Sequence, residues 1–472
     1  MKIFVVFFFA FAFAKILAYP KYYAEEAFKW KNIEYEALLQ PENSYVGPYP
    51  YYIPENNAIG GMAYHPASGL MIVDIVRLRP GVPLTLGAFC TRDYKKGSSP
   101  KIWGFPDYEL NALEATDFAN EKINKRSWDQ GGFNQSQDFR THQNYVHKIP
   151  IYGEPPNVAI EPLFEIKRII AVFHTTIDEK CNRVFFVDNG EFQYYQNTTY
   201  TVQKPSLWVL GIPEDACTSR NFSVIRRLEV SDRIAAKGSG FTQIYLDYTS
   251  DYCDDLFLYI TNPFVGYLMV YDYRKSEFYY FDHETFLPIL SESYLVFNEK
   301  FHFQMNLGIF AISLGYPDKY GQKIAYYTDI ASTAQYEVST AILRDRRKSP
   351  ENYRKDDFRI MGYRGDHHQC FKTLIDYETG VMFYSEAQSN QIRCWNIKRP
   401  LNPDNIDVVF ESEKFDFGLQ MFLDSQGYLW FLYNVVPIIW ASDKPLDLNQ
   451  VNTRFFRMKA SEVIRGTVCE NI

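Results

Sequence analysis

The stretch SGFTQIYLDYTSDYCDDLFLYITNPFVGYLMVYDYRK, residues Ser239–Lys275, contains the pattern on which the fold depends. Apolar residues alternate over residues 244–248, form a nearly unbroken run at Leu256–Ile260, and alternate again at Tyr267–Tyr271. Asp, Asn, Pro and Gly separate these runs. This pattern predicts three strands joined by turns, with the middle strand buried on both faces. Such a sheet has exposed edges and half a core, so it needs similar sheets beside it.

The middle strand recurs along the chain as a short apolar run that ends in a polar residue. The six copies are Leu70–Asp74, Val184–Asp188, Leu256–Thr261, Ile324–Asp329, Val381–Glu386 and Leu429–Asn434. Their first positions are separated by 114, 72, 68, 57 and 48 residues, and the later spacings approach the propeller period of roughly 40–50 residues. We therefore predict an all-β fold, a six-bladed β-propeller. A β-sandwich with coincidental repeats is the alternative.

The excess length before the second copy indicates an insertion between blades 1 and 2. Residues 104–156 are rich in Asn, Gln, Asp, Gly and Lys, which predicts a long loop, with a helical turn near Tyr108–Ile123. At the other end of the ring, the first and last blades must be joined. We expect an N-terminal strand at Trp30–Glu36 to complete the last sheet by pairing with residues 454–457.

Residues 1–18 have the composition of a secretory signal peptide, with an early Lys2, an apolar run and small residues for cleavage. The apolar run ends at Lys15, so it is short for a membrane span, although a retained signal anchor is the alternative. We expect a secreted, extracellular protein in which residues 19–472 form one domain. The net charge of −8 disfavours nucleic acid and anionic membrane surfaces as partners.

An exported chain is expected to carry disulfides and glycans. Seven cysteines leave at least one unpaired, and Cys181 is compatible with either Cys253 or Cys217 as its partner. The sequons at Asn134, Asn197 and Asn221 are the candidate glycosylation sites.

The polar residues that end the six repeated strands are the candidate binding site. We expect the repeated strands to line the axis of the propeller, so that their equivalent ends cluster around one opening. These polar residues are Asp74, Asp188, Asn189, Thr261, Asn262, Thr328, Asp329, Ser385, Glu386 and Asn434. Carboxylates among many Tyr and Phe residues suit a cationic aromatic ligand. In the alternative, these side chains only satisfy backbone groups of the turns.

A metal ion is a second possibility for the same ring, since carboxylate and amide oxygens bind calcium. No contiguous calcium-loop motif is present, and we predict neither a metal nor a cofactor. Catalysis would need an acid–base group, for which His367 and His368 before the fifth repeat are candidates. Adjacent histidines are more often solvated loop residues. No nucleophile elbow, paired-histidine metal motif or phosphate loop is present.

Nine segments, in order over nearly all of the mature chain, resemble the insect Yellow and major royal jelly protein family. They are Phe28–Glu36, Tyr52–Asn57, Arg77–Phe89, Ser99–Asn111, Asp178–Gly190, Cys253–Lys275, Ala331–Asp345, Gly380–Ile406 and Asp424–Pro437. The resemblance implies a secreted six-bladed propeller that acts in cuticle pigmentation, egg-covering hardening or salivary amine binding. It also implies a ligand site in the fifth-blade region, which corresponds here to Phe371, Glu386 and Gln388.

The chain departs from the family pattern at two places. The stretch 104–156 is longer than is usual, and Lys204-Pro205-Ser206 stands where many members have Cys-Pro-Pro, so one common disulfide is in doubt unless Cys217 compensates.

We therefore predict binding of a small aromatic amine or catechol in the axial channel, in extracellular melanin or cuticle chemistry. A dopachrome-converting isomerase and a structural or storage protein without a specific ligand are the alternatives. Whether the protein is an enzyme stays open, and the oligomeric state is not predicted.

Overall fold

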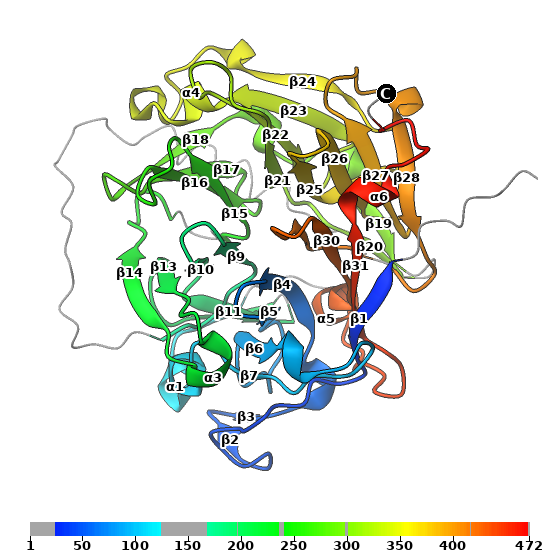
Figure 1. The fold of residues 1–472 in the computed structure, drawn as a ribbon. Coiled ribbons are helices and arrows are strands. Elements are labelled where there is room, and N and C mark those ends of the chain that lie inside the picture. Colours follow the sequence, from blue (N-terminus) through cyan, green and yellow to red (C-terminus); the bar gives the residue numbers. More distant parts are fainter. Residues whose placement is uncertain are drawn as a thin grey trace, which may run out of the picture.

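The computed structural model describes residues 24–123, 168–195, 197–235, 240–297, 301–415 and 417–470. Six four-stranded antiparallel sheets surround a common centre (Figure 1). The predicted all-β, six-bladed propeller is confirmed. The signal peptide, most of the insertion and Asn134 lie outside the described residues.

Each blade is an antiparallel meander. Blade 1 consists of β4 (Ile59–His65), β5 (Leu70–Ile75), β6 (Leu86–Cys90) and β7 (Trp103–Gly104). Blade 2 consists of β9 (Thr175–Asp178), β10 (Arg183–Asp188), β13 (Ser206–Gly211) and β14 (Ser223–Glu229). Blade 3 consists of β15 (Ile244–Tyr248), β16 (Leu256–Asn262), β17 (Tyr267–Asp272) and β18 (Glu277–Asp282). Blade 4 consists of β21 (Ile309–Leu314), β22 (Ile324–Asp329), β23 (Ala334–Ser339) and β24 (Phe358–Tyr363). Blade 5 consists of β25 (Cys370–Asp376), β26 (Val381–Glu386), β27 (Gln391–Asn396) and β28 (Ile406–Glu411). Blade 6 consists of β29 (Met421–Leu423), β30 (Tyr428–Tyr433), β31 (Thr453–Lys459) and β1 (Glu25–Trp30).

The repeated apolar run is the second strand of each blade, so the expectation that it lines the axis is wrong. The first strands β4, β9, β15, β21, β25 and β29 line the axial cavity instead. The physical reason is burial. A second strand has a neighbour on either side and packs against adjacent blades on both faces, which selects uninterrupted apolar residues. The first strands face a partly polar cavity and carry a less regular pattern.

An N-terminal strand closes the ring, as expected, but it lies earlier in the sequence than predicted. Strand β1 pairs with β31, matching Glu25 with Arg457 and Trp30 with Thr453; the two strands lie side by side in Figure 1. Beyond Trp30 the chain leaves the sheet, and Tyr35 makes only an isolated bridge to Ile102. The alternation at 30–36 therefore belongs to a segment that crosses blade 1.

Trp30 anchors this closure, so replacing it is expected to destabilise the ring. Its ring is 1% exposed and packs against Phe89 and Phe455 at centroid distances of 5.8 and 4.8 Å, and Nε1 donates to the Pro100 carbonyl at 2.8 Å. We expect Trp30→Ala to lower the free energy of unfolding by about 3–5 kcal/mol in urea denaturation. Trp30→Phe, which keeps a ring, should cost clearly less; equal small losses for both variants would contradict this role.

Three disulfides tie successive parts of the ring together. Cys90–Cys217 joins blade 1 to the loop helix α3 (Ala216–Ser219) of blade 2, and Cys181–Cys253 joins blades 2 and 3. The structure thus selects Cys253 over Cys217 for Cys181. Cys394–Cys469 fastens the C-terminal tail to blade 5. Cys370 is free and buried.

The inserted segment between β7 and β9 is described at its two ends only. It contains α1 (Tyr108–Asn111) and β8 (Glu121–Ile123). Strand β8 joins a small sheet with β12 (Thr198–Thr201) and β11 (Glu191–Tyr194). Residues 124–167 lie outside the description.

An apolar cap covers one end of the propeller. It includes the hairpin of β19 (Tyr294–Phe297) and β20 (Phe301–Gln304), and α5 (Val436–Ala441). Their side chains form one buried cluster with residues of blades 1, 4, 5 and 6, including Phe371 and Phe417. The polar ends of the second strands lie at this covered end. In the parts of the chain listed above, no helix has the length and apolar character needed to cross a membrane.

Candidate functional site

A cavity of about 210 Å³ runs along the axis and is lined by all six first strands. Its wall combines apolar residues such as Met62 and Leu246 with hydroxyl-bearing Thr176, Ser313 and Thr373. The volume is below the ~300–1,000 Å³ typical of drug-sized sites, so it suits a ligand with one or two rings.

The end of the cavity nearer the apolar cap holds a buried lysine. Lys372 is 8% exposed, and its Nζ donates to Gln243 Oε1 and, at 3.3 Å, to the Tyr245 hydroxyl. The Tyr245 hydroxyl donates to the same Gln243 oxygen at 2.6 Å. Nζ also lies 4.4 Å from the centre of the Tyr245 ring. Within the described residues Lys372 has no carboxylate partner.

Burial sets the protonation of this cluster. It lowers the pKa of Lys372 from 10.5 to about 7, because the charged form loses its hydration. Burial, with a smaller contribution from the positive charge of Lys372, lowers the pKa of His174 to about 3. His174 is therefore neutral near pH 7, and its Nδ1 has no hydrogen-bond partner among the described residues.

The opposite end of the cavity carries a carboxylate. Glu179 follows β9, whereas His174 precedes it, so Glu179 and Lys372 lie at different ends of the lining. Glu179 is half-buried and accepts a hydrogen bond from Ser425 N at 3.1 Å. Burial raises its pKa. Glu179 and Lys372 are the two charged residues of the lining, so the cavity is electrically polarised along the axis.

None of the predicted site residues lines this cavity, although the structure gathers many of them at the capped end. All but Gln388 are buried. They are Asp74, Asp188, Thr261, Thr328, Phe371, Glu386, Gln388 and Asn434. Their role in ligand binding stays a prediction.

Asp74 and Asp188 join adjacent segments of the ring. Asp74 accepts hydrogen bonds from the backbone N at 3.1 Å and the hydroxyl of Thr175, at the start of blade 2. Burial raises the pKa of Asp74 to about 7. Gly61 leaves room for this carboxylate and for His174, because a Cβ there would overlap both. Asp188 accepts from Ile170 N and other backbone amides of the approach to blade 2, and burial raises its pKa.

Three further strand-end residues bind neighbouring protein groups. Thr261 accepts from Gln243 N at 3.2 Å, and Thr328 accepts from Arg364 Nη2 at 2.8 Å. Asn434 accepts from the Val436 N at the start of α5, at 2.9 Å. Thr261 and Asn434 thus bind backbone amides, whereas Thr328 binds a side chain.

The fifth-blade residues also have protein partners. Glu386 lies 2.7 Å from His368 Nδ1 and 3.2 Å from Arg393 Nε, and it accepts from the Ser389 hydroxyl. The carboxylate therefore already has the guanidinium of Arg393 beside it, and His368 and Ser389 as further partners.

Gln388 and Phe371 lie against the cap. Gln388 donates to Gln369 Oε1 at 2.7 Å and accepts from Val296 N of the β19 hairpin at 3.1 Å. Phe371 packs on Phe417 with ring centres 4.3 Å apart. A ligand in the fifth-blade region would have to share this covered space.

Sequence reasoning missed Lys372, Gln243 and Gln420, which lie on or before first strands. Gln420 lines the cavity, and its Oε1 has no hydrogen-bond partner among the described residues. The available signal was a polar residue at the start of a first strand: Gln243 and Gln420 directly precede β15 and β29, and Lys372 is the third residue of β25. It was overlooked because the second strands were assigned to the axis.

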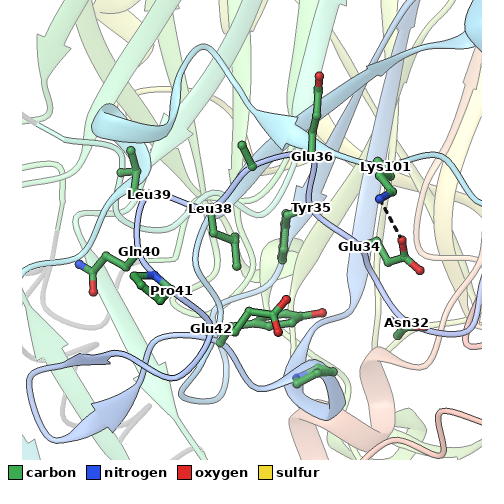
Figure 2. Close-up of a pocket in the computed structure, with 13 residues that line it drawn as sticks. Asn32, Glu34, Tyr35, Glu36, Leu38, Leu39, Gln40, Pro41, Glu42 and Lys101 are labelled. Carbon is green, nitrogen blue, oxygen red and sulfur yellow. Dashed lines mark ion pairs between the residues drawn. The ribbon is translucent and has the colours of Figure 1, made fainter.

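A larger groove of about 720 Å³ lies outside the ring, along residues 32–42 (Figure 2). Its carboxylates include Glu34, which pairs with Lys101 at 3.6 Å, and Glu36, which pairs with Arg220 at 2.8 Å. It is formed mainly by one irregular segment. The axial cavity is the better candidate because strands of all six blades line it and because its wall holds Lys372, a buried lysine without a carboxylate partner among the described residues.

The other candidate groups are placed as follows. Asn221 is exposed and Asn197 half-buried, and their glycosylation stays a prediction. His367 is exposed, and its neighbour His368 contacts Glu386. Across the described ranges, no group of three or more His, Cys, Asp or Glu side chains has the arrangement of a metal site.

Comparisons with known proteins find similar sequences among Yellow-related proteins. The chain is 34% identical over 308 residues to the Yellow-related salivary protein ASP4 of Phlebotomus orientalis, covering 64% of this chain and 74% of the relative. It is 29% identical over 472 residues to the Yellow-related salivary protein SP03 of Phlebotomus perniciosus, covering 100% and 99%.

A third relative is the L-dopachrome tautomerase yellow-f of Drosophila melanogaster, 25% identical over 421 residues, covering 89% of this chain and 83% of the relative. Residues 170–469 match the family described as Major royal jelly protein; they contain blades 2 to 5 and all strands of blade 6 except β1. The chain belongs to the Yellow and major royal jelly protein family.

Proposed function

We propose that this is a secreted Yellow-family protein that binds one small aromatic amine or catechol in its axial cavity, in extracellular melanin or cuticle chemistry. The observation that carries the proposal is the cavity itself, whose lining has a buried cation at one end and a carboxylate at the other. Its size fits one or two rings. Tyr64, Tyr245 and Phe422 in the lining offer aromatic faces to a ring or an ammonium group.

Calorimetric titration with dopamine, serotonin and DOPA tests this proposal. We expect saturable heat with one ligand per chain for at least one of the three. The absence of saturable heat for all three would reject it and favour a structural or storage role.

A dopachrome-converting isomerase is the second candidate, favoured by the similarity to the tautomerase relative. Isomerisation of this kind moves a proton, and the neutral imidazole of His174, next to Thr175 of the lining, is the candidate acceptor; its pKa of about 3 makes it a weak base. The decay of dopachrome should be followed spectrophotometrically with and without protein. Faster decay that is lost in His174→Asn, and kept when exposed His367 is replaced, would support catalysis. Saturable binding without faster decay would leave binding alone.

Glu386→Gln distinguishes the axial cavity from the fifth-blade region. If Glu386 paired with a ligand ammonium, the substitution should weaken amine binding by on the order of 1–3 kcal/mol. Because His368 and Arg393 already surround this carboxylate, we expect the calorimetric affinity to change by less than about 0.5 kcal/mol. A loss of the larger size would move the binding site to the capped end.

A further inference from the structure

We propose that the end of the axial cavity nearer the apolar cap binds an acidic oxygen of a small aromatic ligand, either a carboxylate or an acidic phenol. Lys372 is the residue that binds this oxygen. This inference rests on the proposed function, since it concerns the same cavity. It adds the chemical group that a ligand must carry and the direction in which it lies.

The hydrogen bonding of Lys372 leaves one donor available. A protonated lysine has three N–H donors, and the described protein acceptors are Gln243 Oε1 and the Tyr245 hydroxyl. Lys372 is buried in the wall of the axial cavity and has no carboxylate partner in the described ranges. A buried charge without a counter-ion is costly. A ligand anion would supply both the missing acceptor and the missing charge.

Two further buried amide atoms lack hydrogen-bond partners among the described residues. Gln243 Nε2 is a buried donor on the same amide that accepts from Lys372, and Gln420 Oε1 is a buried acceptor in the lining. The Gln243 amide contacts Nζ through its oxygen, so its unpartnered Nε2 is a donor for an oxygen bound at Nζ, and Gln420 Oε1 is an acceptor in the lining for a ligand hydroxyl. Unmet donors and acceptors of buried groups are rare in folded proteins.

The carboxylate at the other end gives the ligand a direction. Glu179 is separated from the Lys372 end by β9, which spans roughly 13 Å at 3.3 Å per residue. An aromatic molecule with an acidic oxygen at one end and an ammonium group at the other matches the polarity of this lining. The ammonium group would point toward the end that carries Glu179.

The groups around Nζ allow a proton-linked test. Burial lowers the pKa of His174 to about 3, raises that of Cys370 to about 12, and raises that of Tyr245. These three are neutral near pH 7, so Lys372 titrates alone among them. Asp74, behind Thr175, also has its pKa raised to about 7 and must be controlled with Asp74→Asn.

The experiment is a calorimetric titration of the full secreted chain with four probes that separate the two sources of acidic oxygen. Dihydroxyphenylpropionate has a carboxylate and a catechol, phenylpropionate only the carboxylate, dopamine only the catechol, and phenethylamine neither. Each is titrated into the native protein, Lys372→Met and Lys372→Gln. The matched control is Lys204→Met, which removes an exposed lysine far from the cavity.

We expect at least one acid-bearing probe to bind at least about tenfold more weakly to both Lys372 variants, while phenethylamine is unaffected. The carboxylate-only and catechol-only probes then show which oxygen is recognised. At about pH 8, binding of a carboxylate-bearing probe to the native protein should also take up a proton, seen as a heat that depends on the ionisation enthalpy of the buffer. A catechol that binds as a phenolate would instead pass its own proton to Lys372, with no net uptake. The Lys372 variants should lose this uptake, whereas Asp74→Asn should keep it.

Equal affinities of the native and Lys372 proteins for every acid-bearing probe, with no proton uptake, would overturn the inference while leaving ligand binding in the cavity intact. If none of the four probes, serotonin or DOPA binds the native protein, the proposed function fails as well. Retained melting behaviour of Lys372→Gln shows that a loss of affinity is not a loss of folding.

Discussion

Lys372→Met is expected to stabilise the folded protein at neutral pH by about 1–4 kcal/mol, because it removes a buried, unpaired charge. The pKa of Lys372 falls from 10.5 to about 7 on folding, which sets an upper limit of about 5 kcal/mol on the cost of its charge. Gln243 Oε1 keeps its hydrogen bond from Tyr245 in the variant. The substitution therefore leaves no new orphan acceptor there.

The pH dependence has a defined sign. Between about pH 7 and 10.5 the unfolded chain holds the lysine proton and the folded chain does not, so native stability rises with pH. Below about pH 7 the full cost is present. The difference in unfolding free energy between variant and native protein, from urea denaturation across this window, should shrink as pH rises. A constant difference, or a destabilised variant at pH 7, would contradict the account of Lys372.

Lys323→Met is the matched control for this prediction. Lys323 is also largely shielded from solvent, but its Nζ forms a salt bridge with Asp247 Oδ1 at 2.8 Å, and Arg344 pairs with the same carboxylate. Removing it should destabilise the protein rather than stabilise it, since it weakens a satisfied ion cluster. Replacing a shielded lysine that has a carboxylate partner should thus lower the free energy of unfolding, whereas replacing one without such a partner should raise it. A ligand-binding lysine retained at a cost in stability is typical of functional sites.

Asp247→Asn is expected to lower the free energy of unfolding by about 3–5 kcal/mol, the other large effect. Asp247 of blade 3 is fully buried and accepts hydrogen bonds from Tyr259 at 2.6 Å, Lys323 at 2.8 Å and Arg344 at 2.7 Å. Lys323 and Arg344 belong to blade 4, so this carboxylate joins two blades. The amide would keep the shape but leave two partly buried cations without a counter-charge.

Urea denaturation of Asp247→Asn should be compared with Asp232→Asn. Asp232 forms an exposed pair with Lys204 at 3.0 Å, and exposed pairs contribute roughly 0–1 kcal/mol. A triple variant that replaces Asp247, Lys323 and Arg344 by apolar residues should recover much of the loss. If Asp247→Asn costs no more than Asp232→Asn, the cluster does not hold blades 3 and 4 together.

The sequence was sufficient to predict the fold because the second strands repeat a simple pattern. Runs such as Leu256–Thr261 are apolar on both faces, and this demand recurs in every blade. The repeat does not state which of four strands faces the axis. That depends on the order of the strands in the sheet. The second strands were predicted to line the axis, whereas the neighbouring first strands do so. The closing strand was predicted at Trp30–Glu36 but lies at Glu25–Trp30, because an alternating pattern of apolar residues also occurs outside a sheet.

The site was harder to predict because its charge pattern appears only in three dimensions. Lys372 follows Cys370 and Phe371 in an ordinary strand, and its partners Gln243 and Tyr245 lie more than a hundred residues earlier. No local spacing links them. The strand-end carboxylate Asp74, by contrast, was easy to find, yet its oxygens accept hydrogen bonds from Thr175. The polar residue that ends the repeated strand of blade 1 was therefore easy to find, but it joins blade 1 to blade 2.

The most direct test of the axial cavity as the binding site is a crystal structure of the full chain grown with dihydroxyphenylpropionate or dopamine. We predict density for one aromatic ring between the first strands, with a ligand oxygen within hydrogen-bond distance of Lys372 Nζ. Density at the capped end beside Phe371 and Glu386, or in the groove along residues 32–42, with the axial cavity free of ligand, would contradict this account.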